Sequence, residues 1–253
     1  MSPFAFLLIL FLLGLALGSF LSVLIYRLHT GKPGILWGKS ICPHCNKTLG
    51  AFELIPLFSY LIQGGKCRGC KRTIPWHYPV LELSNGLLFV GIALAQFTPL
   101  PLYLFYGLVL IFVFFYDLLY MEIPDEVMFP SIAVALLATF HFEVVLWQSA
   151  LLGAGGLVAF FLIQILLSHG RWLGGGDLRI GAFMGLILGW QLTLVAVFVS
   201  YLLGSIMSLV LLSAGRVSRK SMIAFGPFLV LGTLVALFYG QPLLTWYVTW
   251  LGL

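Results

Sequence analysis

The chain has 253 residues, of which 61% are hydrophobic and only 8% are charged, and its mean hydropathy is +1.10. Soluble domains carry roughly 25% charged residues. A water-soluble fold of this length cannot bury so much apolar surface, so the sequence predicts a polytopic protein of the lipid bilayer. The net charge of +5 does not indicate nucleic-acid binding, because basic residues in membrane proteins mainly set topology.

Apolar stretches predict an all-α polytopic fold with about eight transmembrane helices. The first stretch, Phe4–Leu28, has no basic residue before it. It is also longer than the roughly 7–15 apolar residues of a cleavable signal, so we expect it to be retained as a span. The other predicted spans are Pro79–Phe97, Leu100–Leu119, Val127–Phe142, Val145–Ser168, Leu178–Trp190, Leu192–Ala214 and Ile223–Leu251.

Basic residues indicate how these spans are oriented. With eight crossings, all 13 Lys and Arg residues lie at the same side of the membrane, which the positive-inside bias makes the cytoplasm. Both termini are then predicted to face outward. Leu178–Trp190 is short, but if it turned back within the bilayer, the basic cluster of Arg216, Arg219 and Lys220 would lie outside. The charge pattern therefore favours a full crossing.

The basic residues of the predicted cytoplasmic side fall in three places. They are Arg27, Lys32, Lys39, Lys47, Lys66, Arg68, Lys71 and Arg72 around the first polar segment, Arg171 and Arg179 in the middle, and Arg216, Arg219 and Lys220 near the end. Three regions follow: a first transmembrane helix at 1–28, a cytoplasmic insert at 29–78 and a transmembrane core at 79–253.

All four cysteines lie in the insert, as "CPHC" at Cys42–Cys45 and "CRGC" at Cys67–Cys70. Paired C-x-x-C knuckles are typical of tetrahedral zinc ligation by Cys42, Cys45, Cys67 and Cys70. Disulfides, redox thiols or free thiols are the alternatives, but the cytoplasm disfavours disulfides. Four protein ligands leave no open position, so we expect a structural zinc that supplies stability the small insert lacks.

Acidic residues are few, at eight in the whole chain, and two of them lie at predicted span ends on the cytoplasmic side. Asp117 ends the third span, and Asp177 begins the sixth in "GGGDLRIG". Asp177 has an ordinary interpretation as a helix cap, and Asp125 has a stronger one for the fourth helix. Asp117 lies where its own helix dipole repels a negative charge, so it calls for a partner or a function.

Two carboxylates brought close together share one proton near neutral pH. The ionised member can then take a proton from water while the protonated member donates to a scissile carbonyl. This is aspartic-protease chemistry, and the sequence has no G-x-S-x-G or H-E-x-x-H motif that would favour another mechanism. The glycines at 174–176 would let an extended substrate backbone approach Asp177.

The chain resembles the bacterial type IV prepilin peptidases, also called prepilin leader peptidase/N-methyltransferases. The resemblance covers almost the full length. It is carried by "GSFLSVLIYRL", the two C-x-x-C knuckles, "ELIPLFSYL" between them, "YPVLEL", Asp117 ahead of "IPD", and "GGGD" before a helix. Family members usually have asparagine where this chain has Ser22. Glu53 and Glu82 match family positions without an assigned role.

The resemblance implies an aspartic endopeptidase of the bacterial inner membrane, with Asp117 and Asp177 as the catalytic pair at the cytoplasmic face. It would remove the basic leader of type IV prepilins or of type II secretion pseudopilins. It also implies N-methylation of the new N-terminus with S-adenosylmethionine, for which no site can be assigned from the residues. Glu122, Asp125 and Glu126 would attract a basic leader.

Two other functions remain open from the sequence. An ion-coupled transporter with a regulatory zinc module would need acids near mid-span and helices broken there. A scaffold that docks a secretion ATPase through its zinc module would not need Asp117 or Asp177. Both aspartates lie at span ends on one side, which favours the peptidase.

Overall fold

The computed structural model describes residues 2–31, 38, 40–216, 218 and 221–252. The chain divides into two compact units, Met1–Phe112 and Val113–Leu253. Lys32, Lys39, Arg219 and Lys220, which contribute to the predicted topology, lie outside the described residues.

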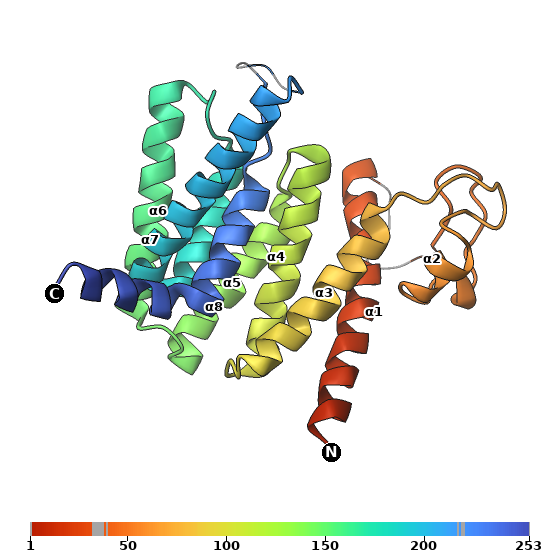
Figure 1. Cartoon of the computed structure of the whole chain (residues 1–253), viewed down its shortest axis with the longest axis horizontal. Helices are drawn as coiled ribbons and strands as arrows, with labels where there is room; N and C mark the ends of the chain where they lie inside the picture. The colour runs from red at the N-terminus through yellow and green to blue at the C-terminus, as the bar shows by residue number, and fades with distance from the viewer. Residues whose placement is uncertain (1, 32–37, 39, 217, 219–220, 253) are drawn as a thin grey trace. The chain divides into compact units, whose positions relative to one another are not determined.

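Seven helices among the described residues are long and apolar enough to cross a membrane, which confirms the all-α polytopic fold (Figure 1). They are α1 (Pro3–Thr30), α3 (His77–Leu94), α4 (Leu100–Tyr120), α5 (Asp125–Phe142), α6 (Trp147–Ser168), α7 (Gly175–Ser213) and α8 (Gly226–Trp250). The polar insert contains a 3-10 turn, η1 (Ala51–Glu53), and a short helix, α2 (Phe58–Ile62). The boundary between the two units falls inside α4.

In the first unit, α1 and α3 pack side by side in opposite directions (Figure 1). Their backbones touch at glycines: a Cβ on Gly14 would lie 2.7 Å from the Cα of Gly86, and one on Gly18 would lie 2.8 Å from the Cα of Glu82. The buried Asn85 side chain donates from Nδ2 to the Gly14 carbonyl at 2.7 Å. Small residues allow this close approach, and an interhelical amide bond reinforces it in an apolar environment.

In the second unit, α7 is broken at Gly189, whose φ of 73° and ψ of 171° are not helical. The limb before the break runs antiparallel to α6, and the limb after it runs parallel to α6, so the chain reverses at Gly189. The contacts that trace this reversal are Gly181 with Phe161, Gly185 with Ala154, Trp190 with Ser149, and Tyr201 with Gln164. The spans predicted at Leu178–Trp190 and Leu192–Ala214 are therefore the two limbs of α7, which explains seven continuous helices where eight spans were expected.

Helix α8 then returns alongside the second limb of α7. Gly240 lies against Leu192 and Gly232 against Ser200. As a result, the end of α4 and the starts of α5, α7 and α8 gather at one end of this unit. This end carries the acidic residues singled out in the sequence.

The α6–α7 contact yields a stability prediction. A Cβ at Gly185 would lie 2.1 Å from the backbone nitrogen of Ala154, whereas a Cβ at Gly155 on the exposed face of α6 meets nothing within 4 Å. We expect Gly185→Ala to lower the free energy of unfolding by roughly 1–3 kcal/mol, because the helices must move apart. Gly155→Ala should leave it unchanged or raise it by about 0.5–1 kcal/mol. Thermal melting of both variants in detergent measures the difference, and equal melting temperatures would contradict this packing.

Candidate active site and metal centre

Asp117 lies near the end of α4 with only 6% of its surface exposed. Its Oδ2 accepts a hydrogen bond from the backbone N–H of Gly226 at 2.8 Å. Gly226 is the first residue of α8, so the positive end of that helix dipole faces the carboxylate. A Cβ at Gly226 would lie 2.6 Å from Oδ2, so glycine is what permits this contact. The sequence analysis called for a partner or a function for Asp117. The structure supplies a partner, which is the start of α8.

Asp177 lies in the first turn of α7 and is also buried. Its Oδ2 accepts a hydrogen bond from the N–H of Gly174, the residue that caps the helix, at 2.9 Å. The sequence offered Asp177 as the N-cap of its helix, and this is wrong: Gly174 is the cap residue, and Asp177, three residues later, reaches back to it with its side chain. Asp117 and Asp177 each accept, through one carboxylate oxygen, a hydrogen bond from a backbone N–H at the start of a helix.

The two aspartates lie at the same end of the second unit, because Asp117 contacts the start of α8 and Gly176, next to Asp177, packs against Ile123 just after α4. Within the described residues, the hydrogen bonds of both use Oδ2 only, and neither takes part in an ion pair. The second oxygen of each carboxylate therefore stays available for a proton or a ligand.

Asp125 does not cap its helix, contrary to the sequence prediction. Pro124 occupies the cap position, and Asp125 is the first residue of α5. Its carboxylate instead pairs with Arg179 of α7, with Nη1–Oδ1 and Nη2–Oδ2 distances of 2.5 and 3.0 Å. Arg179 also donates to the Ile123 carbonyl at 3.4 Å. This bidentate pair joins the start of α5 to Arg179 of α7, two residues after Asp177.

A polar pair that the sequence analysis missed joins α6 to the second limb of α7. The Tyr201 hydroxyl donates to Oε1 of Gln164 at 2.8 Å, and the Tyr201 ring lies against Phe225, the residue before Gly226. Gln164 Nε2 is buried without a hydrogen-bond partner among the described residues. The available signal was a glutamine in the apolar run of α6, because an isolated polar residue in a span usually faces the protein interior.

The three glycines before Asp177 have different roles. Gly174 is the cap residue, and Gly175 and Gly176 begin the helix. A Cβ at Gly176 would lie 2.8 Å from Cδ1 of Ile123, whereas one at Gly175 meets nothing within 4 Å. Only Gly176 is needed for packing, and open space adjoins Gly175.

The four cysteine sulfurs of the insert lie within 4.8 Å of one another, and no disulfide joins them. A tetrahedral zinc with Zn–S distances of about 2.3 Å separates its sulfurs by about 3.8 Å, and Cys42 Sγ and Cys70 Sγ are 3.9 Å apart. The donor set and its dimensions therefore fit a zinc ion. The nearby His44 is outside the cluster and lies 3.1 Å from Arg72 through Nδ1.

The two knuckles have the same backbone hydrogen bonds. Cys42 and Cys67 each donate to the carbonyl five residues ahead and accept from the N–H four residues ahead. Asn46 and Lys71 both adopt positive φ, of 54° and 61°, which closes each turn. Backbone N–H groups of Cys70 and Gly69 lower the pKa of Cys67 to about 7, which favours the thiolate that a metal requires.

Three other residues from the sequence analysis, Glu53, Glu82 and Ser22, lie in the insert or on the two helices that flank it. Glu53 accepts from the Gly50 N–H at 3.0 Å and from Lys47 Nζ at 3.0 Å, and these partners lower its pKa. Glu82 of α3 is buried, and its Oε2 accepts from the Leu57 N–H at 2.8 Å. Ser22, where relatives usually have asparagine, donates to the Ser19 carbonyl at 2.7 Å.

Two family models match the chain in succession. Residues 12–96 match the bacterial peptidase A24 N-terminal domain, and residues 104–209 match the type IV leader peptidase family. The second match includes both Asp117 and Asp177, and the first includes all four cysteines. No solved structure matches the chain.

Curated relatives agree with these models over nearly the whole chain. A protein of Bacillus subtilis is 34% identical, covering 95% of this chain and 97% of its own length. A protein of Aeromonas hydrophila is 32% identical over 98% and 95%, and one of Pseudomonas aeruginosa is 29% identical over 99% and 96%. All three are named prepilin leader peptidase/N-methyltransferase. With two consecutive family models and similarity from end to end, this multi-pass membrane chain belongs to the type IV leader peptidase family.

Proposed function

We propose that this protein is an inner-membrane aspartic endopeptidase that removes the leader of type IV prepilins or type II secretion pseudopilins and then N-methylates the new N-terminus. The observation that supports the peptidase role is that Asp117 and Asp177 are both buried at one end of the second unit, each held by a backbone N–H at the start of a helix. Each carboxylate keeps one oxygen free of hydrogen bonds from the described residues. The names of the relatives support the substrate class and both activities.

The pair would act by general acid–base catalysis. One carboxylate, ionised, takes a proton from the attacking water, while the other, protonated, donates to the scissile carbonyl oxygen. The N–H groups of Gly174 and Gly226 hold the carboxylates in place through Oδ2. Both reacting oxygens are thereby oriented by the rigid starts of α7 and α8.

Chain topology supports a cytoplasmic active site. Two predicted crossings, α3 and α4, separate the basic insert from Asp117, so both lie on the same side, which the positive-inside bias assigns to the cytoplasm. Both termini then face outward. Of the acids expected to attract a basic leader, Glu122 and Glu126 are exposed, whereas Asp125 is already paired with Arg179. The attraction would therefore come mainly from Glu122 and Glu126.

We further propose that Cys42, Cys45, Cys67 and Cys70 hold a structural zinc ion. Bound zinc would join the two knuckles, because each contributes two thiolates to one ion. The four sulfurs leave no ligand position for water or substrate. The methyl donor would be S-adenosylmethionine, as the second half of the relatives' name suggests.

Neutral replacements of the aspartates test the peptidase role. We expect Asp117→Asn and Asp177→Asn each to slow cleavage of a purified prepilin by roughly 10²–10⁴-fold, because general acid–base catalysis is lost. Glu143→Gln, which removes one exposed negative charge after α5, is the matched control and should cleave normally. Gel-shift or mass-spectrometric assays of leader removal measure these rates. Normal cleavage by either aspartate variant would eliminate the mechanism.

Substitutions at two neighbouring glycines distinguish an effect on substrate access from an effect on helix packing. We expect Gly175→Ala to keep the melting temperature of the wild type but to raise KM for prepilin, because the new methyl group enters the open space beside Asp177. Gly176→Ala should instead lower the melting temperature, because its Cβ collides with Ile123. Steady-state kinetics and thermal melting distinguish them. Identical behaviour of the two variants would refute a substrate path over Gly175.

Metal content tests the thiolate cluster. The purified protein should contain one zinc per chain, and Cys67→Ser should lose it and melt at lower temperature, because metal binding stabilises small domains. His44→Ala, which changes a neighbouring residue outside the cluster, should keep the metal. Elemental analysis by mass spectrometry gives the ratio. Stoichiometric zinc in the Cys67→Ser protein would rule out this ligand set.

A further inference from the structure

A short apolar segment of the insert, residues 54–62, exposes its largest side chains. Its sequence is LIPLFSYLI, with no charged residue. Phe58, Leu61 and Ile62 of α2 are 58%, 72% and 74% exposed. Scattered apolar residues are ordinary on a protein surface, but a contiguous exposed group marks contact with a partner or a membrane. The segment therefore requires an occupant that covers it.

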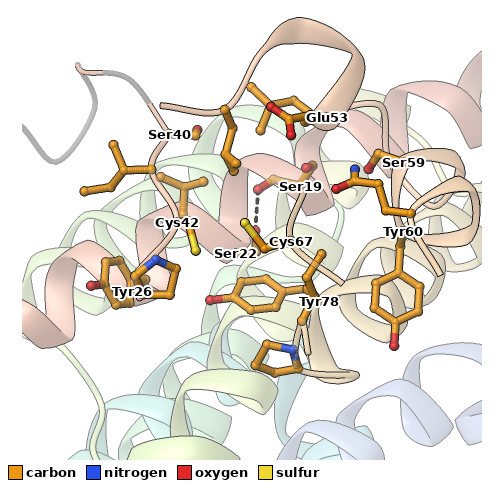
Figure 2. Close-up of a pocket in the computed structure, with 18 of the residues that line it drawn as sticks. Ser19, Ser22, Tyr26, Ser40, Cys42, Glu53, Ser59, Tyr60, Cys67 and Tyr78 are labelled. Atoms are coloured by element: carbon orange, nitrogen blue, oxygen red, sulfur yellow. Dashed lines mark hydrogen bonds between the residues drawn. The ribbon is translucent and has the colours of Figure 1, made fainter. Parts of the chain in front are cut away.

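The two sides of α2 differ in polarity. Figure 2 shows Ser59 and Tyr60 on the side that lines a cavity, which α1 and α3 also border. Phe58, Leu61 and Ile62 do not line this cavity, and their i, i+3, i+4 spacing places them together on another side of the helix. The polar side of α2 thus faces the protein, and the apolar side is turned outward. This is the reverse of a surface helix on a water-soluble domain.

Glu82 of α3 shows how deep α2 begins. The Leu57 N–H, just before α2, donates to Glu82 Oε2 at 2.8 Å. Helix α3 has 18 residues, and at about 1.5 Å per residue it is just long enough for a hydrocarbon core of about 30 Å. Its first residue, His77, must then lie near the edge of the core. Glu82 follows five residues later, which places it and Leu57 about 7 Å deeper.

Helix α1 gives the same depth independently. A Cβ on Gly18 would lie 2.8 Å from the Cα of Glu82, so these two residues are level. The first charged residue of α1, Arg27, follows Gly18 by nine residues, or about 13 Å along the helix. Figure 1 shows α2 beside the body of α1 rather than beyond its C-terminal end. The start of α2 therefore lies alongside the apolar part of both spans.

Charged residues begin where the chain leaves this depth. The Ile74 N–H donates to the Gly65 carbonyl at 2.7 Å, which places Gly65 beside the residues that lead into α3. The exposed cations Lys66 and Arg68 follow directly, and exposed Trp76 precedes α3. Cations above an apolar face match phosphates above acyl chains, and tryptophan is typical of that boundary. The order of polarity along the insert is thus that of a lipid leaflet.

Hydrogen bonding also suits the segment to hydrocarbon, where unsatisfied backbone groups are costly. Ser59, Leu61 and Gln63 each donate a backbone hydrogen bond to the carbonyl four residues earlier. Pro56 has no N–H to satisfy, and the Leu57 N–H is satisfied by Glu82. The buried carboxylate of α3 thus holds the segment at its point of deepest attachment.

We propose that residues 54–62 are immersed in the membrane, with Phe58, Leu61 and Ile62 in contact with the acyl chains of the leaflet nearest the insert. Lys66 and Arg68 lie at the phosphates of the same leaflet. The segment anchors the insert beside α1 and α3, while the cysteine knuckles remain in water. This inference goes beyond the proposed function and does not depend on it.

Photo-crosslinking identifies what covers α2. The full-length protein, with p-benzoylphenylalanine in place of Leu61, is illuminated in vesicles of equal parts phosphatidylethanolamine and phosphatidylglycerol, with and without a purified prepilin. We expect lipid adducts at position 61 to be roughly tenfold more abundant than at position 44, because acyl C–H bonds surround only the former. His44 is the matched control, since it is exposed and belongs to a cysteine knuckle. Mass spectrometry of the adducts gives the yields.

The same probe at Ile62 decides the question if the protein labelled at position 61 does not fold, as judged by thermal melting. Equal lipid adducts at the α2 position and at position 44 would overturn the inference. Adducts formed mainly with the prepilin, or with a second copy of this chain, would overturn it as well, because the face would then be a protein interface.

A charge substitution tests the immersion without a probe. Leu61→Asp should lower the melting temperature in the same vesicles, because a carboxylate is costly in hydrocarbon, although Leu61 is largely exposed within the chain itself. His44→Asp introduces the same charge on a knuckle and should melt as the wild type does. A Leu61→Asp protein that melts with the wild type would show that α2 lies in water.

Discussion

The placement of two buried carboxylates at helix N-termini is the constraint on which the second unit depends. A carboxylate near the edge of an apolar bilayer is costly unless it is hydrogen-bonded. Asp117 and Asp177 meet this requirement with backbone N–H groups of Gly226 and Gly174. Because backbone donors belong to rigid helices, the carboxylates are stabilised without a neighbouring cation that would fix both of them as ionised. In the proposed mechanism, this leaves the pair able to hold a proton.

The positions of those helix starts depend in turn on close contacts between backbones. The limbs of α7 reverse at Gly189, and the first limb lies so close to α6 that only glycine fits at Gly185. This contact fixes the position of the first turn of α7 relative to α6, and thus the position of Asp177. The Asp125–Arg179 pair holds the N-terminal part of α7 against the start of α5. Glycines within apolar spans therefore determine where the acidic side chains lie.

Much of this arrangement was predictable, because the bilayer imposes a strong pattern on sequence. Long apolar runs gave the spans, and two C-x-x-C knuckles gave the cysteine cluster. The partner of Asp125 was not predictable in the same way. An aspartate after proline suits a helix cap, and only the packing of α5 against α7 brings Arg179 within reach. The pairing of Gln164 with Tyr201 was missed for the same reason, since it joins helices whose separation in space the sequence does not encode locally.

The eight acids of this chain can be sorted by their partners, and the sorting separates structural from chemical roles. Asp125 and Glu53 have cationic partners, Arg179 and Lys47, while Glu122, Glu126 and Glu143 are exposed to solvent. The three that remain are Glu82, Asp117 and Asp177, each buried and each held by backbone N–H groups within the described residues. Burial without a counterion is destabilising, so such residues are expected where a ligand or a proton supplies the missing charge. The proposed peptidase site uses two of them to share a proton, and the third, Glu82, joins α3 to the insert through the Leu57 N–H.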